Sequence, residues 1–139
     1  MAKMTGATAH LRRLQRLRGP AMIEPVTRAL FGAAQDIQID AQISITAGAT
    51  SGKNHVASLA PDPPNNDTGV LANNIEAKVV EPLKAEVSSN APYAAAQEFV
   101  SDAANLPERP YMRPAAAKGR PEARKRVVDA VAKVVRGAG

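Results

Sequence analysis

The chain has 139 residues, of which 45% are apolar, and this length supports one hydrophobic core but not two. It contains no cysteine, which excludes disulfide bonds, thiolate nucleophiles and cysteine-ligated metals, and its formal net charge is +5. We therefore expect a single domain, residues 1–139, with a basic segment at 1–20 and a long loop at 47–67. The apolar residues are mainly Ala and Val, which bury little area each, so assembly with further copies would add stability.

Basic residues concentrate at the two ends of the sequence. Four arginines lie between positions 12 and 18, and a second basic group extends from Lys118 to Arg136. Such clusters suit a phosphate backbone or the acidic rim of a protein partner, and they are also typical of solvated helix faces. No apolar run of signal-peptide or membrane-spanning length follows the N-terminal clusters, so we expect a soluble, non-secreted chain without a membrane partner.

The first third of the chain predicts two helices. Thr8 can cap a short helix whose leucines recur every three residues until Gly19-Pro20 ends it. A second helix can begin with Pro25 in its first turn, followed by apolar residues at helical spacing as far as Ile37. The opposite face of the first helix is basic.

Residues 37–46 allow two interpretations. Apolar and polar residues alternate strictly here, which is typical of a strand. If the preceding helix continues instead, every fourth residue from Ile37 stays on its core face, while Ile39 and Ile43 form a second stripe on the opposite side. Of the two, we favour the helix. Ile39 and Ile43 are then a candidate subunit interface, because a neighbouring element or subunit must cover them.

Segment 47–67 is rich in Gly, Pro, Asn and Ser and is predicted to be a long loop. Such loops are uncommon in compact domains and are usually functional or disordered, so ordering on assembly stays an open question. His55 lies in it without a neighbouring acid or second histidine. We interpret His55 as an exposed loop side chain and not as a ligand or base.

The second half of the chain predicts a hairpin and two further helices. Apolar and polar residues alternate over 75–80 and 84–88, with Glu81-Pro82-Leu83 as the turn between two strands. Pro92 permits a short helix from Tyr93 to Val100. A stripe of valines between Pro121 and Gly137 defines a C-terminal amphipathic helix.

These elements together predict an α+β fold. A small antiparallel β-sheet packs against a long N-terminal helix, a short central helix and the C-terminal amphipathic helix. Between the last two helices, Pro107, Pro110 and Pro114 suit an extended edge strand or a rigid turn.

Residues with catalytic potential are few and scattered. Thr50-Ser51-Gly52-Lys53 lacks the upstream glycine, strand and helix of a phosphate-binding loop, and His10 and His55 have no metal-ligand spacing. Glu98 and Arg109 could suggest acid–base chemistry, but a lone carboxylate beside an arginine is far more often a structural ion pair. We therefore expect no enzyme activity, no cofactor and no metal site.

Four short motifs in the C-terminal half carry a resemblance to a known family. They are Thr68-Gly69-Val70-Leu71, Ser89-Asn90-Ala91-Pro92-Tyr93-Ala94, Glu98-Phe99 and Arg109-Pro110-Tyr111-Met112-Arg113-Pro114-Ala115. In this order and at these distances, the chain resembles the tailed-bacteriophage head-tail joining family of minor tail-completion proteins. Val100-Ser101 stands where the family usually has Gly-Thr, so the turn after Phe99 differs from the family's pattern.

The resemblance implies a structural virion protein of the neck. Its subunits would form a homo-oligomeric ring, with six as the expected number, that joins the head connector or stopper proteins to the tail tube protein. DNA would pass through the lumen, and the protein would occur in the virion and, during assembly, in the cytoplasm of the host bacterium. Ring number, and tail completion versus tail termination, stay open.

The Tyr93–Ala115 segment is predicted to be a rigid corner of the fold. We expect Tyr93, Phe99 and Tyr111 to anchor the sheet to the helices. Ordinary core packing is an equally good explanation for Tyr93 and a better one for Phe99. The remaining expectations concern the charged and proline positions: Glu98 pairs with Arg109 or Arg113, and Pro110 and Pro114 stiffen the segment. This segment and the basic ends are two unlike surfaces, as a ring interface requires.

Two alternatives to the neck protein remain. A basic DNA-binding or packaging accessory protein would explain the net charge, although the basic clusters lack interleaved aromatic residues and a recognisable readout helix. A small toxin-like or regulatory bacterial protein is the third interpretation. A closed ring would separate the first interpretation from the other two.

Overall fold

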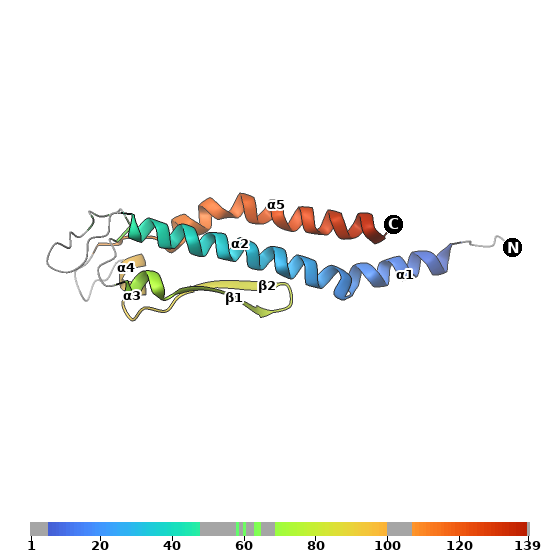
Figure 1. The fold of residues 1–139 in the computed structure, drawn as a ribbon, viewed down its shortest axis with the longest axis horizontal. Helices are drawn as coiled ribbons and strands as arrows, with labels where there is room; N and C mark the ends of the chain where they lie inside the picture. Colours follow the sequence, from blue (N-terminus) through green and yellow to red (C-terminus); the bar gives the residue numbers. More distant parts are fainter. Residues whose placement is uncertain are drawn as a thin grey trace.

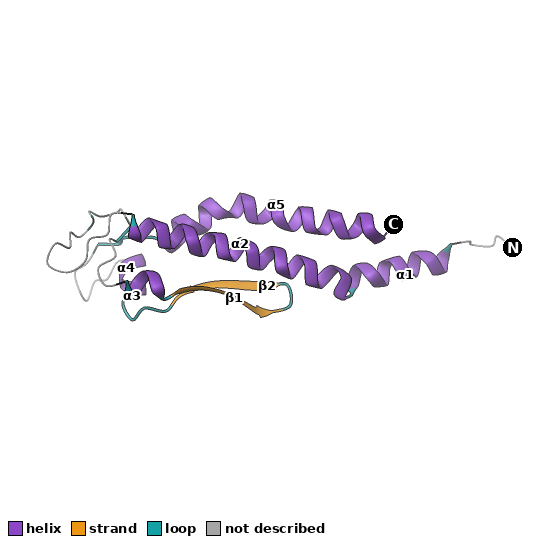
Figure 2. Ribbon diagram, viewed as in Figure 1, coloured by secondary structure: helices purple, strands orange, loops and turns teal. Residues whose placement is uncertain are grey.

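The computed structural model describes residues 6–47, 58, 60, 63, 64, 69–99 and 107–138, and it has the predicted α+β architecture. Two helices of 27 residues each, α2 (Pro20–Thr46) and α5 (Met112–Ala138), pack side by side (Figure 1). In this view α2 lies between α5 and a hairpin of β1 (Ile75–Glu81) and β2 (Lys84–Ser89) (Figures 1 and 2).

Three shorter helices complete the described structure. Helices α3 (Val70–Asn73) and α4 (Ala94–Glu98) lie near the C-terminal end of α2, whereas α1 (Ala7–Arg18) extends beyond its other end (Figure 1). Helix α4 confirms the short central helix. No described helix combines the length and the hydrophobicity needed to span a membrane.

The junction of α1 and α2 differs from the prediction. Gly6, in the left-handed region with φ 85°, precedes α1, so the predicted cap Thr8 lies inside the helix. Helix α2 begins at Pro20 and includes Pro25, so its predicted start is also wrong. Pro20 is well suited to a first helical position because its missing N–H has no partner there, and the Gly19 carbonyl accepts the first bonds, from Met22 and Ile23.

Residues 37–46 are helical, which confirms the favoured interpretation. Ala41 and Ile45 are fully buried, whereas Ile39 and Ile43 are 51% and 56% exposed. The polar side chain before Ile39 also has hydrogen-bond partners. Gln38 donates to the Ile75 carbonyl (3.0 Å) and accepts from the Ala77 N–H (3.1 Å), both in β1. The alternation of apolar and polar residues therefore does not indicate a strand here. It reflects a helix with a buried apolar face, a glutamine bonded to β1, and two exposed isoleucines.

The predicted hairpin is present and depends on α2. Strands β1 and β2 are antiparallel, with Ile75 opposite Ser89 and a register irregularity between Val79 and Glu81. At the turn Leu83 has φ 63°, and its N–H donates to the Thr27 hydroxyl of α2 (3.0 Å). A two-stranded sheet is marginal alone, so α2 supplies the packing that it needs.

Helix α5 begins earlier than predicted. Pro114 and Pro121 both lie inside it, so the predicted edge strand at the prolines and the start near Pro121 are wrong. Pro121 is exposed, and water can therefore reach the carbonyl that lacks a helical partner. Gly119 allows the close approach to α2, because a Cβ there would lie 2.6 Å from Cγ1 of Ile37.

Several predictions fall outside the described residues. Most of the predicted loop at 47–67, with His55 and the Thr50–Lys53 segment, is in this group, as is Val100-Ser101. The single-domain organisation stays a prediction.

Candidate functional site

Three of the four motifs that carry the family resemblance contribute residues to one hydrophobic core, and Glu98 of the fourth binds backbone amides next to it. Gly69, with φ 84°, is the left-handed residue that precedes α3, and Leu71 of the same motif is buried. Ala91 and Ala94 of the second motif belong to the same cluster, as do Tyr111 and Ala115 of the last motif. Helix α2 contributes Ala41 and Ile45 to this cluster. We call this cluster the Tyr111 core.

Tyr111 joins this core to the hairpin. Its side chain is 1% exposed, and its hydroxyl lies 2.7 Å from Oγ of Ser89 at the end of β2. Burial raises the pKa of Tyr111, so the phenol stays neutral, and either hydroxyl can donate the hydrogen bond between Tyr111 and Ser89. Of the three aromatic residues expected to anchor the sheet, Tyr111 is the one with this role.

Glu98, at the end of α4, holds the beginning of α5. Its Oε2 accepts hydrogen bonds from the backbone N–H groups of Tyr111 (2.8 Å) and Met112 (2.9 Å). Its Oε1 accepts from both the backbone N–H and Nε of Arg113, each at 2.9 Å. The carboxylate is 5% exposed and is the buried charged group of the described residues.

This arrangement explains why the motif ends in Tyr-Met-Arg-Pro-Ala. The first amides of a helix lack intrahelical partners, and a negative charge near that end also suits the helix dipole. Glu98 binds the amides of Met112 and Arg113, Pro114 has no N–H to satisfy, and Ala115 donates to the Tyr111 carbonyl at 3.4 Å. The first turn of α5 therefore leaves no amide without a partner.

The charge of Glu98 is maintained despite its burial. Burial raises the pKa of this carboxyl group, but hydrogen bonds from three backbone amides and from Arg113 lower it. The net result is a pKa below the ordinary value of 4.5. Glu98 is thus ionised at neutral pH and acts as a fixed acceptor, and not as a proton donor.

Arg113 is the partner of Glu98, and Arg109 is not. The Arg113 guanidinium donates to the Glu98 carbonyl and to Glu108 Oε2 (2.9 Å), and it lies 4.9 Å from the centre of the Phe99 ring. Arg109 instead donates its N–H to Gln97 (2.6 Å) and its Nε to the Ser58 carbonyl (3.2 Å). Both arginines thereby tie the segment before α5 to its surroundings.

Tyr93 and Phe99 do not anchor the core. They are 42% and 53% exposed, so both the anchoring role and the core-packing explanation are wrong for them. The physical reason is their position: Tyr93 precedes α4 and Phe99 follows it, where the chain leaves the helix. Phe99 stacks outside on Arg113, a contact worth about 0.5–1 kcal/mol at exposed sites.

Three residues that position this core were not predicted as such. Gln38 bridges α2 to β1, and Gln42 donates to the carbonyl of Ala72 in α3 at 3.0 Å. Gly119 permits the contact between α5 and α2. The signal in the sequence was the pair of glutamines four residues apart, which share one face of a helix.

Several grooves run along α2, and two of them are candidate binding surfaces. One, of about 410 Å³, lies between its N-terminal part and the hairpin and is lined by Ile23, Thr27, Val79 and Pro82. The other, of about 360 Å³, lies between α2 and α5 and includes Ile39. Among the described residues, no three or more His, Cys, Asp or Glu side chains are grouped so that they could hold a metal ion.

Comparisons with known proteins assign no family to this chain. No protein-family model, curated protein or solved structure matches it. Its function must therefore be inferred from its own residues and geometry.

Proposed function

We propose that the protein is a structural subunit of a tailed-bacteriophage neck. In this role its copies form a ring that joins the head connector to the tail tube and completes or terminates the tail. The proposal includes no catalytic activity and no cofactor. One observation supports it most: three of the four motifs that resemble the head-tail joining family contribute residues to the Tyr111 core, and Glu98 of the fourth binds the amide of Tyr111.

The Tyr111 core suits a subunit that must present fixed surfaces. Glu98 and Arg113 set where α5 begins, and Tyr111 ties that point to β2. Ring interfaces repeat the same contact through every subunit, so a small change in the angle between elements would prevent closure. A charged cap with several hydrogen bonds limits such changes.

The exposed stripe on α2 supports assembly. Ile39 and Ile43 leave about half of each side chain in contact with water in a single copy. Adjacent exposed apolar residues of this kind mark interaction surfaces. A subunit contact that covers them would gain about 25 cal/mol for each Å² of apolar surface removed from water.

The direct test is genetic and structural. A phage that encodes this chain is deprived of it, and the lysate is examined by negative-stain microscopy. We expect heads and tails that do not join, with joining restored by the wild-type chain. Normal infectious particles without the protein would refute the neck assignment.

The matched test of the surface uses two charge substitutions. Ile39→Asp places a carboxylate in the stripe, and Val128→Asp does so at an equally exposed apolar site on α5 (51% and 58% exposed). Both should fold, since neither side chain is buried. We expect Ile39→Asp alone to block ring formation and particle completion. Equal behaviour of the two variants would contradict a role for the stripe.

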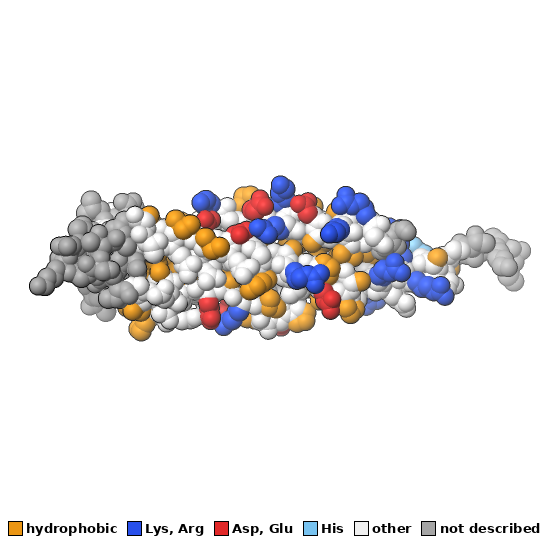
Figure 3. Space-filling view, in the orientation of Figure 1, with side chains coloured by type: hydrophobic (Ala, Val, Ile, Leu, Met, Phe, Trp, Pro, Cys, Tyr) orange, Lys and Arg blue, Asp and Glu red, His pale blue; other side chains and the backbone are white. Residues whose placement is uncertain are grey.

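A DNA-binding accessory protein is the second candidate, and the basic end of the molecule favours it. Helix α1 has four arginines and no carboxylate, and the last two turns of α5 add Lys133 and Arg136. In Figure 3 the end of the molecule formed by α1 shows basic but no acidic side chains. Binding to duplex DNA that weakens steeply with salt would support this candidate, and no binding at low salt would exclude it.

A further inference from the structure

We propose that α1 of one copy docks on the isoleucine stripe of a neighbouring copy. The stripe is Ile39 and Ile43 on α2, and the adjoining groove between α2 and α5 belongs to the same surface. The inference rests on the proposed function, because it names the contact between subunits of the ring.

Helix α1 has an exposed apolar face, although the helix itself contacts both α2 and α5. None of its side chains is buried, and Leu11 and Leu14 are 59% and 43% exposed. Arg18, four residues after Leu14, lies on the same side, because residues three and four apart share a helix face. The N-terminal part of the helix extends beyond the end of α5 (Figure 1), so this exposed face is accessible to a second molecule.

The stripe offers apolar side chains beside carboxylates. Asp36, Asp40 and Glu122 line the groove next to Ile39. Arg126 lies 2.7 Å from Asp36, and Lys118 lies 3.5 Å from Asp40. Three carboxylates and two cations leave a net negative charge. A helix with four arginines and no carboxylate is complementary to this surface in both polarity and charge.

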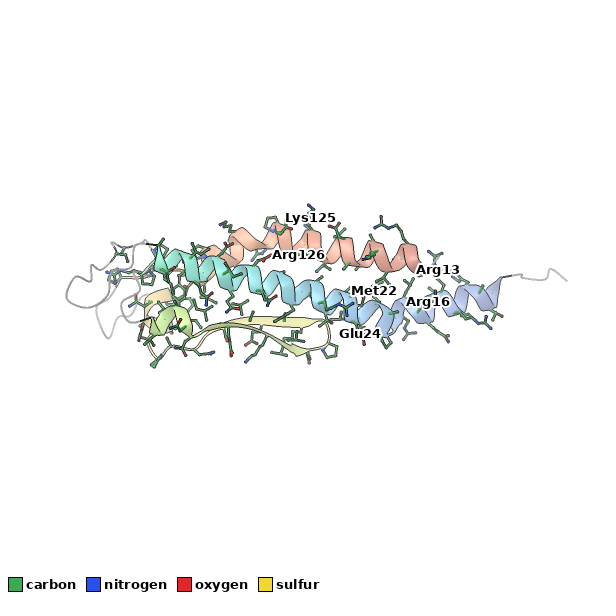
Figure 4. The ribbon with its side chains drawn as sticks, viewed as in Figure 1. Arg13, Arg16, Met22, Glu24, Lys125 and Arg126 are labelled. Atoms are coloured by element: carbon green, nitrogen blue, oxygen red, sulfur yellow. The ribbon has the colours of Figure 1, made fainter. Side chains whose placement is uncertain are left out.

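The groove beside the hairpin is a weaker match for α1. It is apolar as well, but its two carboxylates, Glu24 and Glu81, are balanced by Arg28 in its wall and by Lys84, 3.8 Å from Glu81. The groove beside the hairpin therefore lacks the net negative charge that would complement α1. It also lies near the junction of α1 and α2, and Figure 4 labels Arg16 of α1 and Glu24 of α2 on the two sides of this junction.

A copy cannot cover its own stripe with its own α1. Ile39 is about 30 Å along α2 from Pro20, at 1.5 Å per residue, and α1 points away from it (Figure 1). Figure 3 shows hydrophobic atoms over the far half of α2 beside both acidic and basic side chains, whereas the α1 end shows basic and no acidic side chains. Each copy thus has two different binding surfaces, the exposed face of α1 and the isoleucine stripe of α2. A ring requires two such unlike surfaces on each subunit.

Cysteine cross-linking tests the contact, since the native chain contains no cysteine. Leu14→Cys is purified with one affinity tag and Ile43→Cys with another, and the two full-length proteins are mixed under mild oxidation. We expect a disulfide-linked pair with both tags. Val128→Cys replaces Ile43→Cys as the control for an equally exposed site, and Val79→Cys probes the hairpin groove.

A strong cross-link from Leu14→Cys to Ile43→Cys, with yields near background for the other two, supports the proposal. Equal yields at Val128→Cys, or a preference for Val79→Cys, would overturn it. Ile43→Asp should also weaken self-association about 30-fold or more, as loss of a central interface residue does. An unchanged association constant would count against the contact.

The cross-link and the neck function can fail separately. If the cross-link forms but phage particles are completed without the protein, the contact stands and the neck assignment fails. If particles need the protein but the cross-link is absent, the neck assignment stands and the subunits meet through another surface. In that case α1 is free to bind another partner, with DNA tested by salt-dependent binding.

Discussion

Replacing Glu98 by Gln tests how α5 is held. The substitution keeps the size of the side chain but replaces one acceptor oxygen by an NH₂ group. If that group takes the place of Oε2, the N–H groups of Tyr111 and Met112 lose their acceptor and face a donor instead. The charge that favours the start of the helix is lost as well.

The expected cost follows from these contacts. A buried donor that loses its partner costs about 1–3 kcal/mol, and two such donors with partial relaxation give about 3 kcal/mol. For a chain of this length, each kcal/mol of lost stability lowers the melting temperature by about 3 °C, because the entropy of unfolding links the two quantities. Glu98→Gln should therefore lower the melting temperature by about 10 °C.

The effect of Glu98 should depend on pH in a defined direction. Its pKa in the folded protein lies below the ordinary value of 4.5, so the folded state binds fewer protons than the unfolded state in this range. The stabilisation is complete above that value and is lost as the pH falls through the lower, folded-state pKa. The stability difference between wild type and Glu98→Gln should therefore narrow in acid.

Urea denaturation followed by circular dichroism measures both effects. Glu108→Gln is the matched control, because Glu108 also pairs with Arg113 but its side chain is 45% exposed, and such surface pairs contribute about 0–1 kcal/mol. If Glu98→Gln costs no more than Glu108→Gln, or if its cost is the same at every pH, the capping explanation is wrong.

Two further substitutions test the packing around this point. Tyr111→Phe removes the hydroxyl that contacts Ser89 and should cost about 1 kcal/mol by thermal denaturation, with no further loss when Ser89→Ala is added. Gly119→Ala places a methyl group 2.6 Å from Ile37 and should cost about 1–3 kcal/mol. Gly137→Ala meets no neighbouring atom and should be neutral or stabilising by up to about 1 kcal/mol, so equal effects at the two glycines would contradict the close helix contact.

Local sequence was sufficient to predict an element where its pattern of apolar and polar residues fits only one type of secondary structure. Alternation over 75–80 and 84–88 with a turn between them predicted the hairpin, and the apolar stripe after Pro121 predicted a C-terminal helix. The ion pair of Glu98 was also predicted, although its partner was left open between Arg109 and Arg113. The two arginines lie near each other in sequence, and only the path of the chain before α5 places Arg113 against the carboxylate.

The prolines show where local rules were misleading. Pro114 was interpreted as part of a strand or turn, because proline usually interrupts a helix. In the fold it occupies the first turn of α5, where its missing N–H carries no cost, and Glu98 binds the amides before it. That acceptor comes from α4, so no window of local sequence around Pro114 contains the reason for the helix start.

The sequence by itself determined the elements whose periodicity has one physical meaning, and it limited residues 37–46 to two conformations. Tertiary structure decided between them. As a helix, α2 buries Ala41 and Ile45 against the Tyr111 core and lets Gln38 satisfy the edge of β1, while Ile39 and Ile43 stay exposed. Burial and hydrogen bonding to distant elements outweigh the local preference of alternating residues for a strand, because those contacts exist only after the chain has folded.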